Sequence, residues 1–205
     1  MSIVINGNGT ITGLAVGGLP DGVVDTDMLA NNAVATGKIA DNAVTSAKST
    51  GLGGVSVATI HRVNTQWSGA ADPITNWEAA DAGWDGHIGS MTSSSGIFTF
   101  PSTGIYGVLF KVQPYSSSYH RHTSFYIYAT TNGGTGWDIA ARGEITIIDP
   151  ASSNHHQGMH TIHFIFDVTN TSTHKVKFAT AAGPSFTANS DCNDSYAQFT
   201  KYGDT

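Results

Sequence analysis

Charged residues are scarce in this chain of 205 residues, at 12% of the total, against roughly 25% in an ordinary globular protein. Nine Lys and Arg residues oppose fifteen Asp and Glu residues, which leaves a formal net charge of −6. Binding to nucleic acid depends on neutralising phosphates with basic side chains, so we expect no nucleic-acid partner. The low charge also excludes a coiled coil and a disordered acidic tail.

Cysteine is nearly absent. The single residue, Cys192, cannot form an intrachain disulfide, so stability has to come from packing or from assembly.

Long apolar runs are absent too. No stretch approaches the roughly 20 apolar residues of a membrane-spanning helix, so we expect no membrane insertion. The first residues have neither the basic region nor the apolar core of a secretion signal, which predicts a protein made in the cytoplasm, or one that leaves it without the usual export signal.

Catalytic motifs are also lacking. Nucleophilic catalysis has local signatures such as the Gly-x-Ser-x-Gly elbow, and none is present. Glycoside cleavage needs two carboxyl groups that flank the bond. Glu78 and Glu144 are the only glutamates, with Asp81, Asp85 and Asp138 as further options, and no pair has a motif-like spacing. We therefore expect no enzymatic activity.

A ten-residue repeat, approximately Asn-Ala-Val-x-x-x-Lys-Ile-Ala-Asp, runs through the first fifty residues. Its large apolar positions are Val24, Leu29, Val34, Ile39 and Val44. One copy has too few apolar side chains to offset a backbone entropy cost of about 1 to 2 kcal/mol per residue. Three parallel chains would bury these positions against one another, which predicts a trimeric shaft. A flexible linker rich in Ala, Gly and Asn is the alternative.

Composition divides the chain into three parts. Residues 2–6 alternate like a short strand before a Gly-Asn-Gly turn, and this strand could dock onto the sheet edge of a partner. We interpret residues 1–20 as an attachment segment and residues 21–54 as the shaft and a Gly/Ser-rich linker. The remaining residues, 55–205, form a head.

The head has the pattern of an all-β domain. Apolar and β-branched runs alternate with turn clusters, and no window keeps a helical period. In the run 159–168, Ile162, Phe164 and Phe166 share one face, which predicts a sheet with its other face toward water or a neighbouring subunit. The expected strands are 55–63, 96–100, 105–113, 123–130, 137–148, 159–168, 174–180 and 196–202, with a hairpin tip at 131–134. Their number and spacing are typical of a β-sandwich or jelly roll.

Two loops combine aromatic rings with polar side chains, as sugar-binding sites do. They contain Tyr115 and Tyr119 in one loop, and Trp137 and Asp138 in the other. Loops on rigid scaffolds often carry function, so these four residues are our candidates for contacting a receptor.

Histidines are unusually frequent, nine against nine Lys and Arg. His120 and His122 would point the same way on a strand, so three chains could present six imidazoles to a transition metal. The alternative is solvated or hydrogen-bonded imidazoles. Asp191, Asn193 and Asp194 offer oxygens suited to calcium, but their spacing completes no loop motif. We expect no cofactor, with a transition metal at His120 and His122 or a calcium ion as alternatives.

The segment from Gly96 to Tyr106 and the strand after it resemble the signature strand pair of complement and tumour-necrosis-factor-like heads. Trp77-Glu78, the run 125–128 before Asn132-Gly133, and the closing run 197–202 are similar landmarks. The resemblance implies a ten-stranded jelly roll that forms homotrimers. The chain lacks a collagen stalk, a signal peptide and a clear calcium loop, so immune or cytokine functions are not implied.

The ten-residue repeat resembles repeats in virion fibres of tailed bacteriophages, where a thin trimeric shaft carries a compact head. Head and repeat together indicate a trimeric phage tail fibre or receptor-binding protein on the virion, made in the host cytoplasm. Its expected partners are itself, other virion proteins through the N-terminus, and a glycan or protein of the host surface. The alternatives are a capsid decoration (cement) protein or head fibre, and a secreted or surface bacterial lectin.

Overall fold

The computed structural model describes residues 4–5, 11–12, 34, 39–40, 55–79, 87–148 and 156–205. The chain forms two compact units, Met1–Thr50 and Gly51–Thr205. In the first unit, β1 (Val4–Ile5) pairs antiparallel with β2 (Ile11–Thr12). The strand expected near the start of the chain therefore pairs within its own chain, and its docking to a partner stays a prediction.

Most of the shaft falls outside the described residues, including Val24, Leu29 and Val44. Two shaft positions are described. Val34 is 51% exposed and Ile39 is 41% exposed in the single chain. The trimeric shaft over 21–54 thus stays a prediction.

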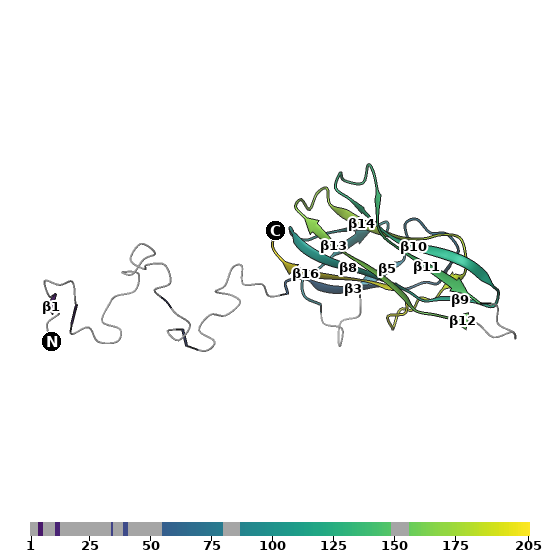
Figure 1. The fold of residues 1–205 in the computed structure, drawn as a ribbon, viewed down its shortest axis with the longest axis horizontal. Helices are drawn as coiled ribbons and strands as arrows, with labels where there is room; N and C mark the ends of the chain where they lie inside the picture. Colours follow the sequence, from purple (N-terminus) through teal and green to yellow (C-terminus); the bar gives the residue numbers. More distant parts are fainter. Residues whose placement is uncertain are drawn as a thin grey trace. The chain divides into compact units, whose positions relative to one another are not determined.

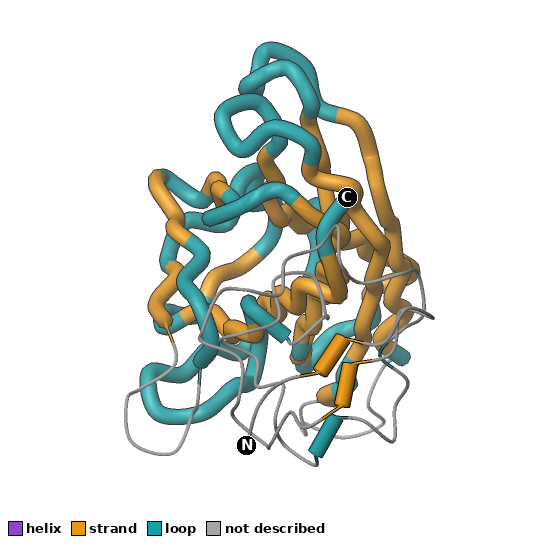
Figure 2. The backbone as a smooth tube through the Cα atoms, turned by 90° about the vertical axis from the view of Figure 1, so that its left-hand side faces the viewer, coloured by secondary structure: helices purple, strands orange, loops and turns teal. Residues whose placement is uncertain are grey.

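The second unit is a sandwich of two five-stranded antiparallel sheets (Figure 1). One sheet has the order β11-β10-β14-β7-β6 and the other β13-β8-β16-β3-β5. Figure 2 shows the strands of the head from a second direction, and no helix occurs in the described part of the chain. The strands are β3 (Ala58–Val63), β5 (Trp77–Ala79), β6 (Thr92–Ser94), β7 (Ile97–Thr99), β8 (Gly104–Val112), β10 (His120–Thr130), β11 (Asp138–Ile147), β13 (His160–Val168), β14 (Lys175–Thr180) and β16 (Tyr196–Gly203).

A small third sheet has the order β12-β9-β15-β4. Its strands are β4 (Trp67–Ser68), β9 (Pro114–Ser116), β12 (His156–Gln157) and β15 (Ser185–Phe186). All eight strands expected from the sequence are present, and β10 begins three residues earlier than expected, at His120. The six unexpected strands have only two or three residues each, which is too short to show a period of two.

The core between the two large sheets contains several phenylalanine rings among valine and isoleucine side chains. Phe98, Phe110, Phe178 and Phe199 are fully buried. Phe110 and Phe178 have ring centroids 4.9 Å apart, and those of Phe98 and Phe199 are 5.1 Å apart. Such tilted and edge-on pairs add to the stability gained from burial alone. The inward face expected for β13 is confirmed, since its alternate residues Ile162, Phe164 and Phe166 pack against this core.

The strand registers define two ends of the head. At one end Val168 pairs with Gly104, and Thr200 pairs with Ala58, where β3 begins. We call this the proximal end, and it lies on the side of the C-terminus in Figure 1. At the opposite end His160 pairs with Val112. We call this the distal end, and β9 and β12 lie there in Figure 1.

The hairpin tip predicted at 131–134 is confirmed between β10 and β11. Gly133 and Gly134 have φ angles of 79° and 101°, which residues with side chains rarely adopt. Asn132 Oδ1 accepts hydrogen bonds from Thr130 Oγ1 and from the Gly136 N–H, at 2.6 and 3.1 Å.

The described part of the chain contains no helix that could span a membrane.

Candidate functional site

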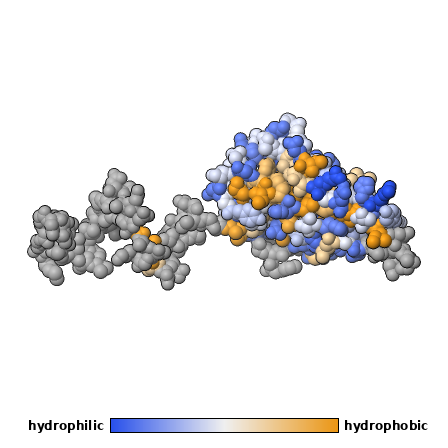
Figure 3. Space-filling view, in the orientation of Figure 1, coloured by the Kyte–Doolittle hydropathy of each residue, from blue (hydrophilic) through white to orange (hydrophobic). Residues whose placement is uncertain are grey.

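The β13-β8-β16-β3-β5 sheet turns a partly apolar surface away from the core, on which charged residues such as Asp167 also lie. Its outward positions alternate with core residues, and the registers align them in rows. Ile165 pairs with Gly107, and His163 pairs with Leu109. Figure 3 shows apolar side chains over the region of β8 and β13. We call this surface the outward face; its large apolar members are Ile60, Ile105, Leu109, Ile165 and Tyr202.

Two members of the outward face are largely exposed in the single chain. Ile165 is 61% exposed and Tyr202 is 57% exposed. The Tyr202 ring lies over Gly107, where any side chain would collide with it. The glycine therefore lets the ring lie against the sheet. An apolar surface of this kind loses contact with water when it packs against another protein surface.

The two glutamates that the sequence offers for glycoside cleavage lie on different sheets. Glu78 on β5 accepts a hydrogen bond from Arg62 Nε at 2.9 Å and another from Asn64 Nδ2 at 3.0 Å. Glu144 on β11 forms an ion pair with Arg142. Each carboxylate thus has a basic partner in its own sheet.

The four candidate receptor residues do not form one site. Tyr115, on β9, and Tyr119, in the turn before β10, lie at the distal end. Tyr115 donates a hydrogen bond to Gln66 Oε1 at 3.2 Å, and Tyr119 is 54% exposed. Trp137 and Asp138 lie at the proximal end, where β11 begins.

Trp137 belongs to a stacked cluster that the sequence does not indicate. Lys177 Nζ lies 5.1 Å from the centre of the Trp137 ring and 5.0 Å from that of Tyr128. The same ammonium contacts the Asp72 carboxylate at 2.6 Å. Burial raises the pKa of Tyr128, and the charge of Asp72 and the neighbouring Tyr126 raise it further. The cation therefore holds Trp137 in place by cation–π attraction.

The candidate metal ligands lie at the distal end of β10. His120 Nε2 is 3.0 Å from Ser116 Oγ, and His122 is exposed. A register shift against β11 falls between His120 and Thr123, so the alternation that would put both imidazoles on one face is interrupted there. The described residues contain no group of three His, Cys, Asp or Glu that could hold a metal ion. A metal at His120 and His122 stays a prediction.

The segment considered for calcium forms a polar turn. The Asp191 N–H donates to Asn189 Oδ1 at 2.7 Å, and Lys111 Nζ donates to the Asn193 carbonyl at 3.2 Å. Cys192 is exposed, and its thiol lies 3.5 Å from Asp194 Oδ1. Burial of the sulfur and the hydrogen bond to Asp194 raise the pKa of the Cys192 thiol.

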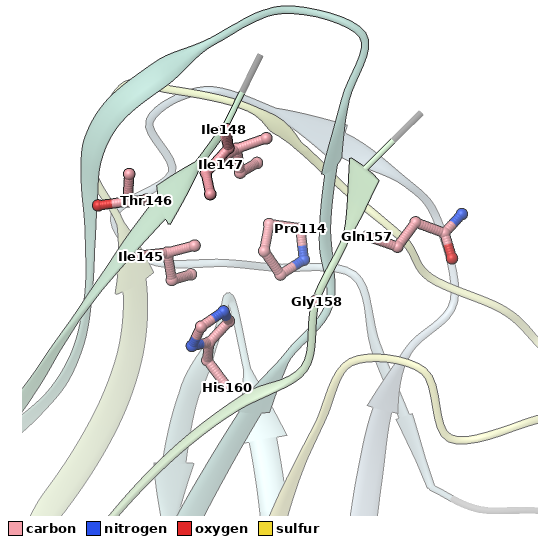
Figure 4. Close-up of a pocket in the computed structure, with 8 residues that line it drawn as sticks. All are labelled: Pro114, Ile145, Thr146, Ile147, Ile148, Gln157, Gly158 and His160. Carbon is pink, nitrogen blue, oxygen red and sulfur yellow. The ribbon is translucent and has the colours of Figure 1, made fainter. Parts of the chain in front are cut away.

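A pocket of about 140 Å³ opens at the distal end, between the end of β11 and the start of β13 (Figure 4). The sequence does not predict it, because its walls come from three separate segments of the chain. Two of its parts are visible in the sequence, namely the apolar run at the end of β11 and His160 as one of several clustered histidines. Its lining residues are Pro114, Ile145, Thr146, Ile147, Ile148, Gln157, Gly158 and His160.

No protein-family model matches this chain, and no curated protein matches it. Solved structures do resemble it. The structure of Eiger TNF from S. frugiperda gives a TM-score of 0.56 at 15% identity, covering 73% of this chain and 94% of that chain. The crystal structure of murine APRIL at pH 5.0 gives a TM-score of 0.52 at 11% identity, and the match covers 71% of this chain and 98% of that chain. The head is thus a jelly roll like that of tumour necrosis factor, which confirms the expected fold class.

Proposed function

We propose that this chain is a non-enzymatic, homotrimeric phage virion protein, a tail fibre or receptor-binding protein whose head adsorbs to the host surface. Residues 1–20 attach it to other virion proteins, and residues 21–54 form the shaft. The resemblance of the ten-residue repeat to those of phage fibres supports the phage assignment, and the fold of the head, which the sequence resemblance associated with trimers, supports the trimer.

The observation that carries the proposal is the outward face. Ile165 stands 61% exposed in the middle of a long regular strand, with Leu109 and Gly107 on the neighbouring strand β8. Burying one such isoleucine stabilises an assembly by about 1.5 to 3 kcal/mol. Three copies related by a closed axis would bury this face and leave no free surface for further growth.

The proposal assigns adsorption to the distal end of the head. The polypeptide arrives at the proximal end, where Ala58 begins β3. A head carried on an N-terminal shaft meets the host with the end remote from that point. Tyr115, Tyr119 and the pocket lie at this distal end, and they are the groups that a host glycan would contact.

The test measures binding of fluorescently labelled full-length protein to host cells, and its competition with phage adsorption. We expect the protein to bind and to block adsorption. Deleting residues 1–20 should leave soluble trimers that bind cells but no longer join particles. Loss of the trimer on that deletion would contradict the division into attachment segment, shaft and head.

Copy number separates this proposal from a decoration role. A capsid cement protein or head fibre needs tens to hundreds of trimers on each particle, whereas a tail fibre needs few. Quantifying the protein against the major capsid protein in purified particles decides between them. A high copy number without cell binding would favour the capsid role.

A further inference from the structure

The distal pocket is lined by apolar side chains, by Gly158 and by polar groups that include the His160 ring. Ile145 and Ile147 are buried side chains, and Ile148 beside them is 69% exposed. Figure 4 shows the His160 ring pointing into the space between Ile145 and Pro114. The Thr146 and Gln157 side chains point away from this space, and they bond to the Arg121 carbonyl and to Gln113 respectively.

The His160 imidazole has unused hydrogen-bonding capacity. Among the described residues its side-chain contact is an edge-on approach to the Phe125 ring, with centroids 6.4 Å apart, and none donates to it or accepts from it. Burial lowers the pKa of His160, so the ring is neutral at neutral pH. A neutral imidazole offers one N–H donor and one acceptor nitrogen, both suited to an uncharged polar ligand.

Tyr119 lies at the same end of the head as the pocket, immediately before β10. Its neighbour in the chain, His120, pairs across β10 and β11 with Ile147, which lines the pocket. Tyr119 is 54% exposed. An exposed tyrosine next to a pocket is suited to stack on the apolar face of a pyranose ring while a substituent of that ring enters the pocket.

The volume and chemistry of the pocket select the substituent. About 140 Å³ is close to the size of a cavity that holds benzene, so a small group fits and a whole sugar does not. Among the described residues the lining contains no Lys or Arg, so these residues offer a carboxylate or phosphate no basic partner. A hydroxyl group alone would leave the isoleucine walls in contact with polar atoms. An acetamido group supplies a methyl for the isoleucine side chains, and either its N–H or its carbonyl for a hydrogen bond with His160.

We propose that the distal pocket binds the acetamido group of an N-acetylated hexosamine in a host-surface glycan, with the sugar ring resting on Tyr119. This assignment rests on the proposed function, because it names the chemical class of the adsorbed glycan. It assigns the pocket to a sugar rather than to an apolar peptide side chain, since a peptide side chain would leave the imidazole without a partner.

Saturation-transfer NMR on the full-length protein tests the assignment with N-acetylglucosamine and N-acetylgalactosamine as probes. Glucose and galactose are the matched ligands that lack the acetamido group. We expect the strongest transfer at the acetyl methyl, and an affinity at least about tenfold higher than for the parent sugars. Equal affinity for the parent sugars, or transfer that avoids the methyl, would overturn the assignment.

Two variants close the pocket in different ways. His160→Phe enlarges the ring at this position and removes the hydrogen bond, and Ile148→Trp covers the mouth from an exposed position. The control Ile139→Trp makes the same change at a site on β11 that is 54% exposed and lies at the proximal end. We expect both pocket variants to lose binding of the acetylated sugars and the control to keep it. If His160→Phe fails to fold, Ile148→Trp decides the outcome.

Cell binding separates failure of this assignment from failure of the proposed function. If the protein binds host cells but neither acetylated sugar binds or competes, the acetamido assignment is wrong and the adsorption role stands. If Ile148→Trp binds the sugars normally, the pocket is not the site. If the protein binds neither cells nor sugars, both proposals fail.

Discussion

Tyr119 and Trp137 stand at opposite ends of the same β-hairpin: Tyr119 immediately precedes β10, and Trp137 immediately precedes β11 after the hairpin tip. The intervening strand β10 has 11 residues, a length of roughly 35 Å. The two loops that resemble each other in composition therefore cannot contact one small ligand together.

This separation predicts different consequences for the two residues. Tyr119→Ala should weaken binding to host cells about tenfold, because it removes a stacking surface worth up to about 1.5 kcal/mol. Trp137→Ala should leave cell binding unchanged and lower the free energy of unfolding by about 1 kcal/mol, through loss of the contact with Lys177. Cell-binding titrations and urea melts of both variants measure this. The reverse pattern would place the receptor site at the proximal end.

The outward face predicts a substitution that breaks the assembly. Ile165→Asp puts a charge on β13, the edge strand of this face, and should convert trimers to monomers, because a buried unpaired carboxylate is strongly unfavourable. Ile139→Asp is the matched control, since Ile139 is 54% exposed on β11 of the other sheet. Sedimentation velocity of both variants tests this. A trimeric Ile165→Asp protein would show that another surface holds the chains together.

We expect the head to lose stability in acid because the His61 ring is buried. Its ring lies edge-on to Phe98, with centroids 5.1 Å apart, and burial followed by the charge of His87 lowers its pKa to about 4 from 6.5. The unfolded chain therefore binds an additional proton between these values, and stability falls as the pH drops through this window. The loss amounts to about 3 kcal/mol at most.

The variant His61→Phe isolates this effect. Phenylalanine suits the aromatic surroundings and does not titrate, so the variant should lose less stability than the parent between pH 7 and pH 4. Urea unfolding at pH 7 and pH 4 gives the change in the free energy of unfolding for the parent and for the variant. An equal loss in parent and variant would show that other groups cause the acid sensitivity.

The space around Gly143 is too small for a side chain, because β11 packs closely against its neighbours there. A Cβ atom at this position of β11 would overlap the Phe125 ring and lie 2.9 Å from Ile162 Cγ2. Gly143→Ala should therefore destabilise the head by about 1 to 3 kcal/mol. A Cβ atom at Gly203 would have no other atom within 4 Å, so Gly203→Ala is the control with little expected change. Thermal unfolding compares the two, and equal melting temperatures would contradict the packing described.

The long strands could be predicted because burial leaves a period of two in the sequence. The run from His160 to Val168 shows this best, with Phe164 and Phe166 inward and Ile165 outward. Strands of two or three residues, such as β9 and β12, carry no such period. They form because Tyr115 and Ser116 find hydrogen-bonding partners at Gln157 and His156, a pairing set by the long strands around them.

The site was less predictable than the fold. Aromatic loop residues can be found by composition, but their positions at opposite ends follow only from the length of β10. The pocket depends on bringing Pro114, Ile147 and His160 together from separate strands. His160 belongs to a histidine cluster that is visible in the sequence, yet nothing in the sequence distinguishes its half-buried ring from the exposed His163.

The central claim is that three copies of this chain assemble through the outward face. Multi-angle light scattering of the full-length protein at neutral pH tests it most directly, with Ile165→Asp measured beside it. The account predicts about 64 kDa for the parent, three times the 21.4 kDa of one chain, and a monomer mass for the variant. A parent protein of 21.4 kDa would contradict it.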